Sequence, residues 1–161
     1  DEVIVVVNSS IQKETFESML SSRANVVVDK QEAQSPLVGA LTGFESAEGM
    51  YSLLLPCDTP FISIQIAQFL LDICVNRSAV IPRWPSGYIE PLQAAYQTKL
   101  AVTAAKKALE KGKLDLRSMI AHLRMVRYVS TMVIGQMDPK LLTFFNVNTP
   151  DDLRRAESFL R

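Results

Sequence analysis

The stretch Tyr51–Phe61, "YSLLLPCDTPF", runs from a buried strand straight into an acidic turn. Its first five residues predict a short strand that is covered on both faces, as in the parallel sheets of α/β proteins. Pro56 and Pro60 stand on either side of Asp58, and each proline restricts the backbone beside it. The stretch therefore predicts a strand that ends by presenting a carboxylate in a stiff turn.

Similar strands recur along the first half of the chain, with helices between them. We expect strands at 3–7, 25–29, 51–55 and 78–82, and helices at 36–46 and 63–74. This alternation predicts a mostly parallel sheet with right-handed crossovers and helices on both faces. Ligands of such sheets bind beyond the carboxyl ends of the strands.

The second half of the chain is less regular. We expect a loop at 82–92, strands at 92–97, 126–129 and 130–134, helices at 98–111 and 115–123, and a final helix that begins at Pro150. The 161 residues fit one domain, 1–161, with a single core.

Composition excludes several classes of protein. Hydrophobic residues make up 48% of the chain, so a packed core is expected and disorder is not. Seventeen basic residues balance seventeen acidic ones, which gives no overall field for nucleic acid or an anionic membrane. No apolar run reaches the roughly 20 residues that span a bilayer. The two cysteines, Cys57 and Cys74, predict reduced thiols in a cytoplasmic protein.

Three polar side chains follow predicted strands, namely Asn8, Asp29 and Asp58. We expect them on one rim of one sheet, where a ligand would bind. Asp58 suits Mg²⁺, which takes one or two protein oxygens and leaves its other positions to water and phosphates. Asp58 could equally cap the helix that starts near Ser63, or only fix its turn. Asn8 and Asp29 suit hydrogen bonds to a sugar or a base, or ordinary capping of loops.

Two further segments offer ligand contacts. Gly39, in "SPLVG", would let the backbone approach a ligand closely, or would serve with Gly43 for tight packing of a helix. Asn146 and Asn148 alternate in "NVNTPDD", just before a helix N-terminus, which is an anion site by geometry. The alternative for this pair is an N-cap and its neighbour.

Four segments taken together resemble a known family. The segments "SPLVGALTGF", "LLLPCDTPFIS", "EPLQAAY" and "FFNVNTPDDLRRAE" closely resemble the MobA-type molybdenum cofactor guanylyltransferases of the nucleotidyltransferase-like superfamily. The resemblance implies an α/β fold, a three-layer α/β/α sandwich with a mostly parallel, Rossmann-like sheet, as in nucleotide-diphospho-sugar transferases. It also implies Mg²⁺-dependent transfer of GMP from GTP to Mo-molybdopterin, with release of pyrophosphate.

The resemblance also implies roles for individual residues. GTP and molybdopterin would be the small-molecule substrates, with docking to a molybdoenzyme or a chaperone as a further partner and the oligomeric state left open. The implied site residues are Asp58 as the catalytic aspartate that binds Mg²⁺ and the nucleotide phosphates, Asn8, Asp29 and Gly39 toward GTP, and Asn146, Asn148 and Glu90 on the pterin side.

One departure from the family pattern concerns the phosphates. The family begins with a strand and a glycine-rich loop of the form LAGGxSxRMGxDK, whereas this sequence contains no Gly-Gly pair and matches from the second strand onward. The first βα unit, roughly forty residues, is therefore expected to be missing, and the chain as given is expected to bind GTP poorly and to be inactive. Alternatives are a shortened, non-catalytic relative that binds pterin, nucleotide or a partner protein, a molybdopterin cytidylyltransferase, or a cobinamide-phosphate guanylyltransferase.

Overall fold

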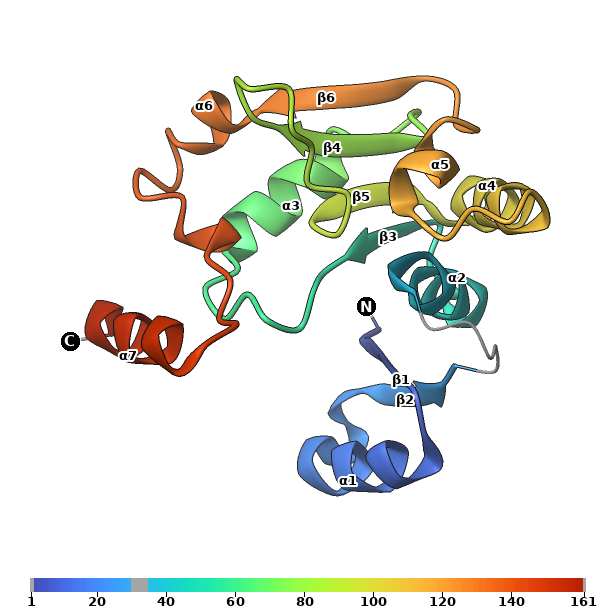
Figure 1. Ribbon diagram of the computed structural model, residues 1–161. Coiled ribbons are helices and arrows are strands. Elements are labelled where there is room, and N and C mark those ends of the chain that lie inside the picture. Colours follow the sequence, from blue (N-terminus) through green and yellow to red (C-terminus); the bar gives the residue numbers. More distant parts are fainter. Residues whose placement is uncertain (1, 30–34, 161) are drawn as a thin grey trace.

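A computed structural model describes residues 2–29 and 35–160 as alternating strands and helices (Figure 1). The strands are β1 (Ile4–Val7), β2 (Asn25–Val28), β3 (Tyr51–Leu54), β4 (Ala79–Arg83), β5 (Ala94–Gln97) and β6 (Val126–Ser130). The helices are α1 (Ser10–Leu20), α2 (Pro36–Ser46), α3 (Ile64–Asp72), α4 (Thr98–Glu110), α5 (Leu116–Ile120), α6 (Thr131–Ile134) and α7 (Pro150–Phe159). Two short 3₁₀ turns are η1 (Ser21–Arg23) and η2 (Leu142–Phe144).

The main sheet has four strands in the order β3-β5-β4-β6. Strand β5 runs antiparallel to both of its neighbours, while β4 and β6 are parallel. Strands β3, β4 and β6 therefore share one direction, and their carboxyl ends lie at the same edge. Only β5, between β3 and β4, departs from the parallel arrangement that the sequence predicts.

Helices cover both faces of this sheet, which makes the expected three-layer α/β fold (Figure 1). On one face, Ile81 and Tyr96 pack among buried side chains of α2, α4 and α5. On the other face, Val80 and Val129 pack against Ile66 and neighbouring residues of α3 and α6. Consecutive residues of β4 thus serve opposite layers, as the alternation of side chains along a strand requires. Each fully buried Ile or Val contributes about 1.5–3 kcal/mol.

Strands β1 and β2 form a separate parallel pair. Helix α2 joins this pair to the rest of the molecule, because it contacts both β1 and β2 and also α4 (Figure 1). At the start of β1, Glu2 Oε1 accepts hydrogen bonds from the main-chain N–H groups of Glu48 and Gly49, at 2.7 and 2.9 Å. No strand among the described residues pairs with both β1 and β3, so the single rim expected for Asn8, Asp29 and Asp58 is divided between two sheets.

Local capping explains where two helices begin. Ser35 caps α2 by accepting a hydrogen bond from the N–H of Val38, and Pro36 occupies the first helical position, where a missing N–H costs nothing. Thr149 caps α7 in a reciprocal capping box with Asp152, ahead of Pro150. Both helices begin at the residue that the sequence predicts.

The prediction of a strand at 130–134 is wrong, because most of this segment is helical. Residues Thr131–Ile134 form the short helix α6, which Ser130 caps by accepting from the N–H of Met132. Thr131 and Ile134 are buried while Met132 and Val133 are exposed, so the burial follows a helical turn. A run of five residues is too short to distinguish the period of a helix from that of a strand, and tertiary contacts decide between them.

Within the described residues, no helix is both long and apolar enough to cross a membrane.

The two thiols differ in their accessibility to solvent. Cys57 is exposed, whereas Cys74 is buried, and burial raises the pKa of the Cys74 thiol to about 11. Because the thiolate is the reactive form, Ellman's reagent at pH 8 is expected to modify one thiol quickly in the native protein and the second only after unfolding in urea. The variant Cys57→Ser should lose the fast reaction. Two fast thiols in the native protein would contradict the burial of Cys74.

Candidate functional site

Asp58 lies in the turn that follows β3, four residues beyond Leu54. Its main-chain carbonyl accepts a hydrogen bond from the N–H of Val147, at 2.8 Å. Its side-chain Oδ1 is buried and has no hydrogen-bond partner among the described residues. Ser63, and not Asp58, caps α3 by accepting from the N–H of Ile66. Asp58 therefore does not cap α3, and its Oδ1 has no hydrogen-bond donor among the described residues.

The segment before α7 lies against this turn through Val147. Asn146 and Asn148, on either side of Val147, are both exposed. Beyond them, the N–H groups of Asn148 and Thr149 donate to Asp152 Oδ2, at 3.3 and 3.0 Å. The hydrogen bond from the Thr149 hydroxyl is the main cause that lowers the pKa of Asp152. The structure thus brings Asp58 and the asparagine pair together.

A cluster of aromatic rings holds these two segments in place. The Phe61 ring, just after the Asp58 turn, lies 6.2 Å from the ring of Phe145 and 5.8 Å from that of Phe159 in α7. The rings of Phe145 and Phe159 are 5.3 Å apart, and the Arg155 guanidinium lies over Phe145 at 5.4 Å. Edge-on aromatic pairs of this kind add about 0.5–1.5 kcal/mol each. Sequence reasoning missed this cluster, although "PF" and "FFN" stand inside the motifs that it quotes.

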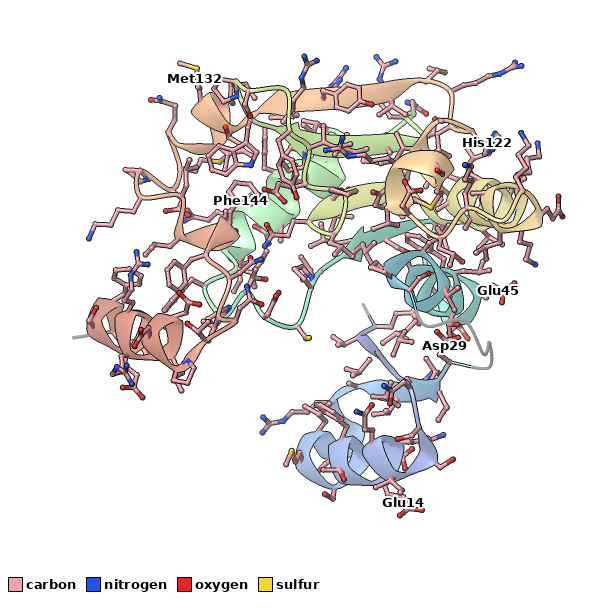
Figure 2. All side chains as sticks on the ribbon, viewed as in Figure 1. Glu14, Asp29, Glu45, His122, Met132 and Phe144 are labelled. Carbon is pink, nitrogen blue, oxygen red and sulfur yellow. The ribbon has the colours of Figure 1, made fainter. Side chains whose placement is uncertain are left out.

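Glu90 lies beyond β4, at the same edge of the main sheet as the Asp58 turn. One of its oxygens, Oε1, accepts from the indole N–H of Trp84 at 2.7 Å, which closes the 84–90 loop on itself. The Trp84 ring then lies 5.6 Å from the ring of Phe144, and Gln93 Nε2 donates to the carbonyl of Thr143 at 2.6 Å. Figure 2 shows Phe144 at this end of the sheet. Glu90 thereby positions the loop that borders the 143–149 segment.

Asn8 and Asp29 lie together at the carboxyl edge of the β1–β2 pair. The N–H of Asp29 donates to the carbonyl of Val7 at 2.7 Å, which continues the ladder of the two strands. Asp29 Oδ1 accepts from the Thr42 hydroxyl of α2 at 2.9 Å, and the N–H of Asn8 donates to Gln12 Oε1 at 3.1 Å. Figure 2 shows Asp29 beside α2, far from Phe144. The structure confirms Asn8 and Asp29 as neighbours but assigns them to a different sheet from β3 and Asp58.

Gly39 and Gly43 lie in α2 in different surroundings. A Cβ atom on Gly43 would meet Val6 Cγ2 at 3.3 Å, so Gly43 serves the packing of α2 on β1. A Cβ atom on Gly39 would meet no described atom within 4 Å. Of the two alternatives that the sequence leaves open, tight packing therefore applies to Gly43, and Gly39 is the glycine with no described atom beside it.

Alanine at these two positions provides a matched test. Alanine is better than glycine in a helix by about 0.5–1 kcal/mol, so Gly39→Ala is expected to raise the free energy of unfolding by that amount. Gly43→Ala is expected to gain less or to destabilise, because its methyl group presses on Val6. Urea denaturation measures both. A gain from Gly43→Ala as large as that from Gly39→Ala would contradict the packing described.

The acidic residues around the Asp58 turn do not form a ready-made cage for a metal. Among residues 2–29 and 35–160, no cluster of three or more His, Cys, Asp or Glu side chains could hold an ion. Mg²⁺ does not need such a cluster, because it commonly binds one or two carboxylates together with water and substrate phosphates. A single buried carboxylate oxygen without a partner fits that requirement.

Comparison with known proteins identifies the family. Residues 1–127 match the model of the MobA-like NTP transferase domain. The chain belongs to this family. A probable molybdenum cofactor guanylyltransferase of Methanosarcina mazei is 32% identical over 157 residues, which are 95% of this chain and 70% of that protein. A second, from Methanothermobacter thermautotrophicus, is 29% identical over 95% of this chain and 77% of that protein.

A solved structure agrees with this assignment. Molybdopterin-guanine dinucleotide biosynthesis protein A of Archaeoglobus fulgidus is 25% identical and superposes with a TM-score of 0.81, over 98% of this chain and 77% of that chain. The fold and the nucleotidyltransferase class expected from the sequence are thus confirmed.

Proposed function

We propose that this MobA-like chain transfers GMP from GTP to the terminal phosphate of Mo-molybdopterin, with Mg²⁺ bound at Asp58. The observation that carries the proposal is the buried Oδ1 of Asp58, which has no partner among the described residues. The names of the relatives, molybdenum cofactor guanylyltransferases, supply the nucleotide and the acceptor. Burying a carboxylate oxygen without a partner is costly, and a bound cation would remove that cost.

The proposed reaction needs positioning more than acid–base chemistry. A phosphate oxygen of the acceptor attacks the α-phosphorus of GTP, and the bond from that phosphorus to the β-phosphate oxygen breaks as pyrophosphate leaves. The metal, when bound, supplies neutralisation of the charge on the phosphates. The chain supplies a rigid Asp58 turn, fixed by Pro56, by Pro60 and by the hydrogen bond from Val147.

On the nucleotide side, Asn8, Asp29 and Gly39 are proposed to contact GTP. Asn8 and Asp29 are neighbours beyond parallel strands, where the hydroxyls of a sugar and the edge of a base are commonly bound. The space around Gly39 suits the close approach of a flat base to the helix. The hydrogen bond from Thr42 orients the Asp29 carboxylate for this role.

On the acceptor side, Asn146, Asn148 and Glu90 are proposed to border the pterin. The exposed amides of Asn146 and Asn148 offer both donors and acceptors to a heterocycle. Glu90 contributes through the loop that it closes with Trp84. The free thiols, Cys57 and Cys74, are consistent with the cytoplasmic location that we propose.

Calorimetry of nucleotide binding tests the role of Asp58. In the full-length protein, Asp58→Asn is expected to weaken binding of Mg²⁺–GTP by about tenfold or more, because an amide replaces the charged ligand of the metal. Asp72→Asn is the matched control, since Asp72 is an exposed carboxylate at the end of α3. This control should bind Mg²⁺–GTP as the parent does.

Two results would overturn the proposal. Equal binding of Mg²⁺–GTP by Asp58→Asn and the parent would remove Asp58 from the metal site. Tighter binding of Mg²⁺–CTP than of Mg²⁺–GTP would reassign the nucleotide.

A further inference from the structure

A hollow lies at the other end of the main sheet from Asp58. It has a volume of about 410 Å³ and is lined by residues at the amino ends of β3, β4 and β6 and at the carboxyl end of β5, together with α4. We call it the far hollow. Figure 2 shows His122, one of its lining residues, on the α4–α5 side and far from Phe144. The strands of the main sheet therefore separate the far hollow from the Asp58 turn.

The far hollow has basic side chains and no acidic ones. Arg77, Lys107, His122 and Arg124 are among its thirteen lining residues, none of which is Asp or Glu. In the part of the chain that the structure describes, none of these four side chains forms an ion pair. The neighbouring Lys106 differs, because its Nζ lies 2.6 Å from Glu45 Oε1. Three unpaired cationic side chains, Arg77, Lys107 and Arg124, create a local positive potential around the hollow, in a chain whose formal net charge is +0 with histidine neutral.

The two arginines stand next to residues with an unusual backbone. Asn76, before Arg77, has a φ of 60°, and Met125, after Arg124, has a φ of 57°. Side chains other than glycine rarely adopt this left-handed conformation, and a methionine there is strained. The N–H of Asn76 donates to the Tyr51 hydroxyl at 3.0 Å, which fixes the turn before β4. Strain of this kind gathers at ligand sites, where it holds a chain in one direction.

The remaining walls of the far hollow show what kind of anion would fit. Leu100, Leu123 and Met125 contribute apolar surface, and Ser78 and Thr103 are polar members of the lining. The Thr103 hydroxyl donates to the carbonyl of Lys99. A volume of about 410 Å³ lies within the range of small-molecule sites. We propose that the far hollow binds a small organic phosphate, with the phosphate on Arg77, Lys107 and Arg124 and the apolar body against the leucines and the methionine. This site is separate from the proposed nucleotide and pterin sites.

Titration calorimetry with 1-naphthyl phosphate tests this proposal. The buffer contains EDTA, so that no divalent cation at Asp58 contributes. The double variant Arg77→Gln/Arg124→Gln is expected to bind the probe about tenfold or more weakly than the parent, because charge-assisted hydrogen bonds to the phosphate are lost. The matched control, Lys113→Gln/Arg127→Gln, removes two exposed positive charges outside the far hollow and should bind as the parent does. 1-Naphthol, which lacks the phosphate, should bind weakly to all of them.

Three results would overturn the proposal: no binding of 1-naphthyl phosphate to the parent, an equal loss in both double variants, or equal binding of 1-naphthol. Circular dichroism checks that each variant is folded. Should the arginine variant fail to fold, Lys107→Gln replaces it, because Lys107 is exposed on α4 and glutamine is also a good helix former. Lys107→Gln should weaken binding of the probe, and an unchanged affinity would overturn the proposal.

Discussion

The hydrogen bond from the N–H of Val147 to the main-chain carbonyl of Asp58 joins the two halves of the candidate site. At 2.8 Å, it holds the turn after β3 against the segment before α7, although the two are far apart in the sequence. Because the bond uses main-chain groups only, it leaves the side chains of Asp58, Asn146 and Asn148 for a ligand. The rings of Phe61, Phe145 and Phe159 pack beside it and stiffen the same junction.

The carboxylates near this junction differ in their hydrogen bonds, and this difference supports the proposed role of Asp58. Asp152 accepts hydrogen bonds at the start of α7, and Glu90 accepts one from Trp84, so both serve the fold. Asp58 Oδ1 is buried and accepts none from the described residues. A buried carboxylate oxygen without a partner costs stability, and a bound ion is one way in which that cost is removed. The proposal of a metal site at Asp58 therefore rests on the missing hydrogen-bond partner of its Oδ1.

Much of the fold could be predicted because local chemistry determines it. Short apolar runs predicted the strands, and Pro36 and Thr149–Pro150 predicted the starts of α2 and α7. Long-range pairing could not be predicted. The antiparallel β5, the separation of β1–β2 from β3, and the contact between Asp58 and Val147 all depend on residues distant in sequence. The site residues were predicted one by one, whereas their grouping around two different sheets required the structure.

The most direct test of the metal site is a crystal structure of the full-length protein soaked with Mn²⁺ and a non-hydrolysable GTP analogue. Mn²⁺ takes the oxygen ligands of Mg²⁺ and is located by its anomalous scattering. We predict an anomalous peak within bonding distance of Asp58 Oδ1, from an ion that also contacts phosphate oxygens of the analogue. A peak that lies elsewhere, with Asp58 free of the metal, would contradict it.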